Sequence, residues 1–205
     1  MKLYFSKRAP NPRRVSWVVA EKGAADLEQI DIDLLKGDHQ TPEYRAKVGL
    51  PTVPALELDD GAVITESLAI CRYLEALYPE PNLFGHTPRQ VAMIEMWTRR
   101  AEMMLATPLM LTVRHSHPAL AVLEKQSPEV AQSNRTAAER SLRLFETQLG
   151  AHAFIAGDTI SIADIVAYIG FDFARMVKFA IPDDMPNLTR WAAAMRERPA
   201  AKAGV

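Results

Sequence analysis

Two short groups of residues in the first half of the chain could bind a ligand. Thr52-Val53-Pro54 opens a β-like run, and Glu66-Ser67 stands directly before the apolar helical run Leu68–Leu74. A proline cannot donate to a sheet ladder, so Pro54 belongs at the first residue of a strand or in a turn. Cis peptide bonds are nearly confined to X–Pro, which makes Val53–Pro54 the first place to expect one. We interpret the stretch from Thr52 to Ser67 as a binding site that the rest of the chain supports.

The elements that must position these residues are a β-α-β unit, a hairpin and a further helix. Residues 2–5 and 27–34 show the period-two alternation of strands. Between them, Asn11 is expected to be the N-cap of a helix and Pro12 its first residue. Asp60-Gly61 is typical of a tight turn between two more strands. This order predicts a small four-stranded α/β domain whose first two strands are parallel.

From about residue 87 the alternation stops and helical spacing takes over. The expected helices cover residues 88–107, 109–117, 128–149, 161–179 and 187–198. Ser161 and Asp164 form a capping box at the start of the fourth, which is a structural signal. The sequence therefore predicts two domains, an α/β domain over residues 1–80 and an all-helical domain over residues 87–205.

Composition and charge narrow the class of protein. The chain has 205 residues, 48% hydrophobic and 24% charged, which is enough to bury a core. With a net charge of −1, the chain has no excess of positive charge that would attract nucleic acid or anionic membranes. No apolar run approaches the roughly 20 residues that cross a bilayer, and a single cysteine leaves no disulfide framework or multi-cysteine zinc site. We expect a cytoplasmic protein without a metal, nucleic-acid or membrane partner.

Three signatures together resemble the glutathione transferase superfamily, and the resemblance covers nearly the whole chain. They are Val53-Pro54 before a hairpin, Glu66-Ser67 opening a helix, and Gly157-Asp158-x-x-Ser161-Ile162-Ala163-Asp164 in the helical part. The resemblance implies an α/β thioredoxin-like N-terminal domain, an all-α C-terminal domain and a homodimer. It also implies a detoxifying transferase that uses glutathione as cosubstrate and no further cofactor.

The resemblance assigns the γ-glutamyl and cysteinyl parts of glutathione to the opening stretch. Val53, before the expected cis-Pro54, would pair its backbone with the cysteinyl amide, as in β-augmentation. The helix N-terminus at Ser67 suits the γ-glutamyl carboxylate, and Glu66 could accept from the γ-glutamyl ammonium. Taken alone, Glu66-Ser67 could instead be ordinary helix capping.

For the glycyl carboxylate of glutathione the candidates are His39, Lys36 and Thr52. The string Lys36-Gly37-Asp38-His39 is similar to the matching loop of the family, although Lys36 alone could be a solvated lysine. The sequence departs from the family pattern at Val48-Gly49-Leu50-Pro51, where relatives often carry Asn-Pro-x-Gly. We expect that turn to be rebuilt.

No single residue stands out as the group that ionises the thiol. Family members use Tyr, Ser or Cys near the end of strand one or the start of helix one. Ser6 lies at the strand end, although it could equally be a simple strand-terminating serine. Asn11 and the backbone N–H groups of Arg13 and Arg14 could stabilise a thiolate instead, while Tyr4 lies on the opposite strand face from Leu3 and Phe5.

His115 and Cys71 are the remaining side chains whose chemistry could take part in catalysis. An atypical subgroup of the family uses a water held by His and Ser of the helical domain, which makes His115 in Arg114-His115-Ser116-His117 a candidate. His115 could also belong to a surface helix end. Cys71 follows the binding turn within a helix, and we expect it to be a buried small hydrophobic residue.

The favoured function is conjugation of the glutathione thiolate to small hydrophobic electrophiles. The resemblance to the family places the second-substrate pocket at Met103, Met104, Thr107 and Met110, and methionine suits such a pocket because it adapts to varied apolar ligands. The alternatives are a glutathione-dependent isomerase or reductase, and a non-catalytic binding protein with the same fold. Thiol-reductase relatives usually carry a loop cysteine, so its absence argues against reduction.

Overall fold

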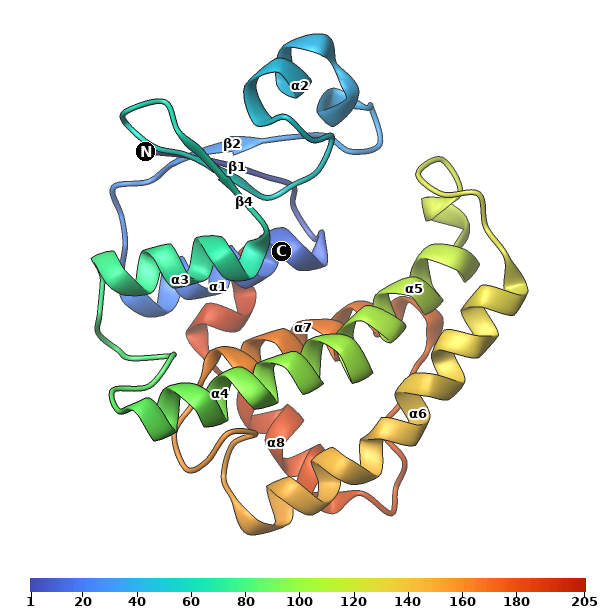
Figure 1. The fold of residues 1–205 in the computed structure, drawn as a ribbon. Coiled ribbons are helices and arrows are strands. Elements are labelled where there is room, and N and C mark those ends of the chain that lie inside the picture. The colour runs from blue at the N-terminus through green and yellow to red at the C-terminus, as the bar shows by residue number, and fades with distance from the viewer. The chain divides into compact units, whose positions relative to one another are not determined.

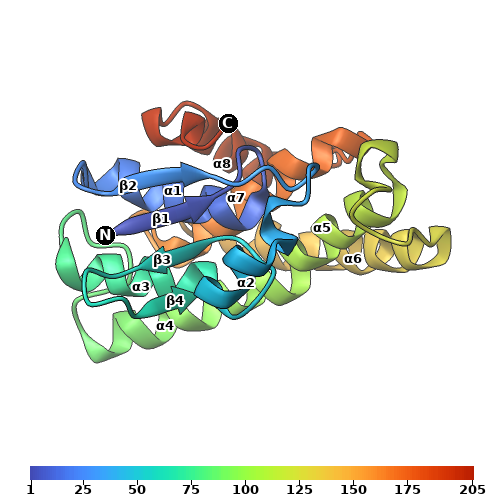
Figure 2. The same cartoon turned by 90° about the horizontal axis from the view of Figure 1, so that it is seen from above.

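In the computed structural model, which describes residues 1–205, a four-stranded mixed sheet forms the frame of the N-terminal part (Figures 1 and 2). Strands β1 and β2 are parallel, while β3 is antiparallel to both β1 and β4. The predicted parallel pair and hairpin are thereby confirmed. The strands, in the sheet order β2-β1-β3-β4, are β2 (Glu28–Asp31), β1 (Lys2–Phe5), β3 (Ala55–Glu57) and β4 (Val63–Thr65).

Helices cover both faces of this sheet. Helices α1 (Pro10–Lys22) and α3 (Ser67–Leu77) pack together on one face, and α2 (Pro42–Val48) lies on the other (Figure 1). Successive side chains of β1 point to opposite faces of the sheet, so each face has apolar side chains for its helices to cover. Tyr4 packs among residues of α2, while Leu3 points to the opposite side.

Two expected boundaries in this part are wrong. Helix α1 begins at Pro10 with Ala9 as N-cap, so Asn11 lies inside the first turn and is not the cap. A proline is tolerated in the first helical turn, where its missing N–H would have no partner. Strand β2 ends at Asp31 because the Asp33 carboxylate accepts the N–H groups of Leu35 and Lys36 at 3.0 and 3.1 Å and turns the chain.

The chain divides into two units. Unit 1 comprises Met1–Pro81 together with Lys202–Val205, and unit 2 comprises Asn82–Ala201. The last residues are tied to unit 1 because the Arg8 N–H donates to the Gly204 carbonyl at 2.8 Å.

Unit 2 is built of helices around α7. Every residue of α7 from Ile162 to Phe171 is buried. Gly170 permits close packing, because a Cβ at that position would lie 2.8 Å from the Ala106 Cα. The helices are α4 (Pro88–Arg100), α5 (Thr107–Ser116), α6 (Pro128–Ala151), α7 (Ile162–Ala174) and α8 (Pro186–Arg196).

The sequence predicts a break in the helix before Pro108. This prediction is wrong, because the chain stays helical from α4 into α5. Residues Ala101–Ala106 form a π-helical segment that joins α4 to α5. The Thr107 N–H donates to the Glu102 carbonyl, five residues back, so the bonding pattern has already shifted when the chain reaches the proline. Pro108 then occupies the first turn of α5, where its missing N–H is tolerated.

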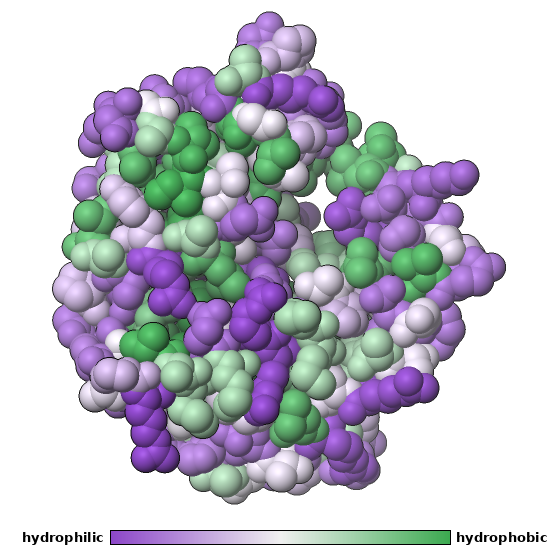
Figure 3. All heavy atoms as spheres, in the orientation of Figure 1, coloured by the Kyte–Doolittle hydropathy of each residue, from purple (hydrophilic) through white to green (hydrophobic).

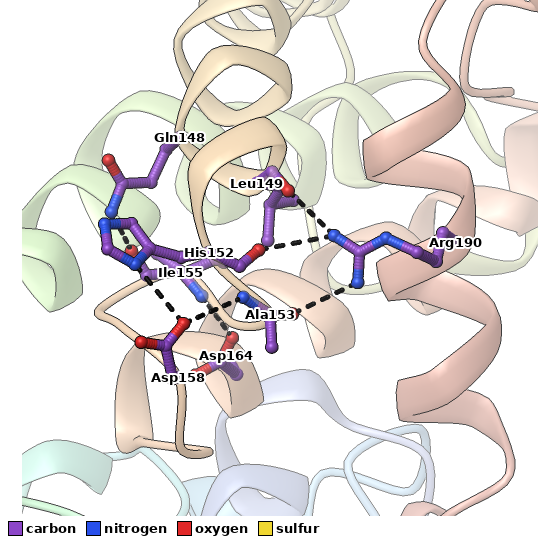
Figure 4. A network of polar contacts seen from close by, with 8 residues as sticks. All are labelled: Gln148, Leu149, His152, Ala153, Ile155, Asp158, Asp164 and Arg190. Carbon is purple, nitrogen blue, oxygen red and sulfur yellow. Dashed lines mark hydrogen bonds and ion pairs between the residues drawn. The ribbon is translucent and has the colours of Figure 1, made fainter.

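The capping box predicted at the start of α7 is confirmed, and its Asp164 is buried. Figure 4 shows Asp164 beside Ile155, with Arg190 of α8 near Leu149. The Asp164 carboxylate accepts the Ser161 N–H at 2.9 Å, the Ile155 N–H at 2.8 Å and the Trp191 indole N–H at 2.9 Å. Burial raises the pKa of Asp164, while these hydrogen bonds act in the opposite direction. Nearby, Arg190 of α8 donates to the Leu149 carbonyl at 2.7 Å, which fastens the end of α6.

The surface mixes hydrophobic and hydrophilic side chains. Figure 3 shows several groups of hydrophobic residues among hydrophilic ones on one face. No helix has both the length and the apolar character that a bilayer crossing requires.

Candidate functional site

The turn that enters β3 leaves one residue with unused backbone groups. Val53–Pro54 is a cis peptide bond, as predicted. Neither the N–H nor the carbonyl of Val53 forms a hydrogen bond within the chain. An unpaired N–H and carbonyl on one residue can pair with the backbone of an extended peptide, in the manner of an added strand.

The N-terminus of α3 offers donors to an anion. Its first N–H groups, beginning at Ser67, have no partner within the helix. Ser67 is 5% exposed, and its hydroxyl accepts from the Arg14 guanidinium at 3.3 Å. A helix N-terminus with a hydroxyl and a nearby cation is well suited to a carboxylate.

Glu66 precedes this helix in an uncommon backbone conformation. Its φ is +66°, a region that residues other than glycine rarely adopt, and its side chain caps no helix N–H. Such conformations cost about 1–3 kcal/mol and cluster at ligand sites. The exposed Glu66 carboxylate is therefore available to a positively charged group rather than used as a cap.

Strand register brings the loop after β1 to the same end of the sheet. The last pair of β1 with β3 is Tyr4 with Ala55, and the first pair of β3 with β4 is Ala55 with Thr65. Extending both registers by two residues beyond these pairs would bring Ser6 and Ser67 opposite Val53. Residues that are far apart in the sequence, including Pro54 and Glu66, are in this way gathered at one sheet end.

The two catalytic candidates of unit 1 both carry unused polar atoms. Ser6 is 7% exposed, and its hydroxyl forms no hydrogen bond within the chain. The Asn11 side-chain oxygen is buried and has no hydrogen-bond partner. The Ser6 hydroxyl can therefore still donate to a ligand, whereas the Asn11 oxygen is an exception to the rule that buried polar groups are paired.

Three residues are candidates to bind a second carboxylate of the ligand, and they differ in burial, charge and free hydrogen-bonding groups. The His39 ring is 8% exposed, its Nε2 lies 2.9 Å from the Gln40 amide, and burial beside Arg45 lowers its pKa. It is therefore neutral near pH 7. The Lys36 side chain is 80% exposed and forms an ion pair with Asp33 at 3.3 Å. Exposed Thr52 adjoins Val53, and its hydroxyl forms no hydrogen bond.

The remaining predicted residues belong to unit 2. Met103 and Met104 lie on the π-helical segment and are 61% and 41% exposed, while Thr107 and Met110 lie on α5. A cavity of about 470 Å³ in this unit lies between α5, α6 and the turn Arg175–Val177, and none of those four residues lines it.

His115 has a structural partner within unit 2. Its Nδ1 accepts the Ser127 N–H at 3.3 Å, just before α6, so the neutral ring carries its proton on Nε2. That Nε2–H has no partner and can still hold a water or a ligand atom. Cys71 of unit 1 is fully buried, and burial raises the pKa of its thiol to about 12, which removes it as a nucleophile.

Sequence reasoning missed two side chains that support the site, those of Arg14 and Tyr44. Arg14 is 2% exposed within α1, four residues before Val18 on the apolar stripe. A charged residue at a position where helical spacing predicts burial was the signal that could have identified the Arg14 side chain. Tyr44 of α2 donates its hydroxyl to the Thr52 carbonyl at 2.7 Å, and no sequence pattern pointed to this contact.

Comparisons with known proteins agree with this arrangement. The model of the glutathione S-transferase N-terminal domain matches residues 3–82, and the model of the glutathione S-transferase C-terminal domain matches residues 101–199. Glutathione S-transferase 2 of Saccharomyces cerevisiae is 37% identical over 98% of this chain and 88% of its own length.

Solved structures show the same likeness. The crystal structure of Gtt2 from Saccharomyces cerevisiae is 36% identical, covers 100% of both chains and has a TM-score of 0.91. A glutathione S-transferase domain-containing protein from Marinobacter aquaeolei VT8 is 35% identical, covers 98% of this chain and 99% of its own, and has a TM-score of 0.92. The predicted family and fold class are confirmed by these matches.

Proposed function

Because this chain belongs to the glutathione S-transferase family, we propose that unit 1 binds glutathione as cosubstrate and that the enzyme joins its sulfur to small hydrophobic electrophiles. The observation that carries the proposal is the gathering of unused polar groups at one end of the sheet. Val53, Glu66 and Ser67 there match the three chemical groups of the γ-glutamyl-cysteinyl half of glutathione.

The γ-glutamyl group is held at α3. Its carboxylate accepts from the Ser67 hydroxyl and the first N–H groups of the helix, and its ammonium donates to the Glu66 carboxylate. The cysteinyl residue pairs its backbone with Val53, next to Pro54. For the glycyl carboxylate we favour Thr52, since its hydroxyl is unused and adjoins Val53, with His39 and Lys36 as further contacts.

The thiol must lose its proton to react. A free thiol has a pKa near 8.5, and lowering it by about 2 units takes about 2.7 kcal/mol of thiolate stabilisation. The unused hydroxyl of Ser6 can donate to the sulfur, and the amide N–H groups of Asn11, in the first turn of α1, can add further stabilisation. His115 of the helical unit is the second candidate, acting through a water on its free Nε2–H.

The reaction is a nucleophilic substitution or addition. A sulfur lone pair forms the new bond to the electrophilic carbon. In a substitution the leaving group departs with its bonding pair, and in an addition the π electrons move to the neighbouring atom, which takes a proton from water. We place the electrophile against Met103, Met104, Thr107 and Met110, where the exposed thioethers of Met103 and Met104 can receive an apolar molecule. A homodimeric, cytoplasmic enzyme of detoxification is the biological setting that we propose.

The first test is the rate of glutathione conjugation to a chloronitrobenzene, followed by absorbance of the thioether, in the wild type and in Glu66→Ala. We expect the Glu66 variant to have a raised KM for glutathione. Glu28→Ala, which removes an exposed carboxylate on β2, is the matched control and should behave as the wild type. Equal rates in all three proteins would reject the site.

Calorimetry with glutathione separates the alternatives. Binding without conjugation of any electrophile would favour isomerisation or a non-catalytic binding protein, and the absence of both heat and thermal shift would reject glutathione binding altogether. The buried Cys71 disfavours thiol reduction, because a thiol with a pKa of about 12 is protonated at neutral pH.

A further inference from the structure

The turn that carries Val53 has little backbone support of its own. Between Leu50 and Pro54 the chain forms no backbone–backbone hydrogen bond. The last such bond of α2 runs from the Gly49 N–H to the Arg45 carbonyl at 2.9 Å. A side chain holds the stretch instead, because the Tyr44 hydroxyl donates to the Thr52 carbonyl at 2.7 Å.

The peptide group that Tyr44 holds is the one that contains the Val53 N–H. The cis peptide bonds of the chain are Val53–Pro54 and Glu80–Pro81, so the bond between Thr52 and Val53 is trans. A trans peptide is planar, and its C=O and N–H point in opposite directions. Holding the Thr52 carbonyl toward α2 therefore aims the Val53 N–H away from α2.

Tyr44 is itself held firmly. It is 7% exposed, its N–H donates to the Thr41 hydroxyl at 3.2 Å, and its ring packs edge-on against Tyr4 with the centroids 5.9 Å apart. Burial raises the pKa of Tyr44 to about 12, so the hydroxyl keeps its donor proton at neutral pH.

The helix that carries Tyr44 is fastened to the sheet. Lys47 of α2 lies 3.2 Å from the Glu57 carboxylate of β3, and the same carboxylate accepts the Tyr4 hydroxyl at 2.5 Å. Tyr44 and Val53 therefore keep their relative positions through α2 and β3. A mobile α2 would leave the Thr52 carbonyl free to turn.

We propose that Tyr44 is a positioning residue for glutathione: its hydroxyl holds the Thr52–Val53 peptide so that the Val53 N–H is presented to the cysteinyl carbonyl. This inference rests on the proposed function. It adds α2 to the elements that determine affinity, although Tyr44 does not contact the ligand.

The test compares Tyr44→Phe, which removes one hydroxyl and keeps the ring, with Tyr78→Phe as matched control. The Tyr78 hydroxyl also donates within unit 1, to Asp26, away from the candidate site. Calorimetry should show glutathione binding weakened about five-fold in Tyr44→Phe, the effect of one neutral hydrogen bond. Tyr78→Phe should bind glutathione as the wild type does.

A second ligand separates positioning from general loosening. γ-Glutamylcysteamine keeps the γ-glutamyl group and the thiol but lacks the cysteinyl carbonyl, so Tyr44→Phe should bind it as tightly as the wild type. Equal weakening for both ligands, or unchanged glutathione binding, would overturn the inference alone. Failure of the wild type to bind glutathione would overturn the proposed function and this inference with it.

Discussion

The Arg14 guanidinium donates to the Ser67 hydroxyl across 3.3 Å, and both residues are at least nine-tenths buried. The contact joins α1 to α3 and orients the hydroxyl. Because its oxygen accepts from Arg14, its proton is free to be donated to an anion at the N-terminus of α3. The arginine also adds positive charge where the helix dipole is already positive.

Ser67→Ala should therefore weaken glutathione binding about ten-fold or more, since a hydrogen bond to a charged group contributes about 1.5–3 kcal/mol. Titration calorimetry measures the change directly. Ser133→Ala, on an exposed position of α6, serves as the control and should leave affinity unchanged. An unaltered Kd in Ser67→Ala would remove this residue from the site.

The contacts of Glu57 with Tyr4 and Lys47 should make the stability of the protein change with pH in the acidic range. The hydrogen bond from Tyr4, followed by that from Lys47, lowers the pKa of Glu57. Folding then favours the ionised carboxylate, so the contact stabilises the protein above the ordinary glutamate pKa of about 4.3 and loses this effect as pH falls through the lowered value.

The measurement is the melting temperature of wild type and Glu57→Gln from pH 7 to pH 3. The wild type should be more stable at neutral pH, and the difference should shrink below about pH 5. A difference that is constant with pH would show that the charge on Glu57 does not matter.

Asp164→Ala should be the most damaging single change in unit 2. It would leave the N–H groups of Ser161, Ile155 and Trp191 buried without an acceptor. Each such loss costs about 1–3 kcal/mol, so a total of at least about 3 kcal/mol is expected. Urea unfolding followed by circular dichroism should show it, with a smaller loss for Trp191→Phe, which removes one of the donors. Equal midpoints for Asp164→Ala and the wild type would contradict the prediction.

Cys71 should be chemically silent in the folded protein. Its thiol is fully buried and has a pKa of about 12, so at pH 8 only about one part in ten thousand is thiolate. A disulfide reagent such as dithiobis-nitrobenzoate should release no colour from the native protein and one equivalent after denaturation. Cys71→Ala should conjugate at the wild-type rate. Rapid labelling of the native chain would show that the helix after the binding turn opens.

Local signals were enough to predict the elements that carry the site. The Asp60-Gly61 turn, Pro54 and the Ser161–Asp164 capping box act within a few residues, so their outcome depends on the neighbouring sequence alone. The change from period-two to helical spacing near residue 87 is equally local. Pro108 was misjudged because the adjacent π-helical segment shifts the hydrogen-bond pattern, and no propensity marks such a segment.

The sequence by itself determined that a hairpin with Val53-Pro54 leads into a helix opened by Glu66-Ser67. Only the tertiary structure decided which residues stand around them. The pairing of β1 with β3 brings the loop after β1 to the end of the sheet where β3 begins, and Arg14 reaches Ser67 across 53 positions of sequence through the packing of α1 on α3. Contacts of that range depend on strand register and helix packing, which many side chains set together, and no short motif encodes them.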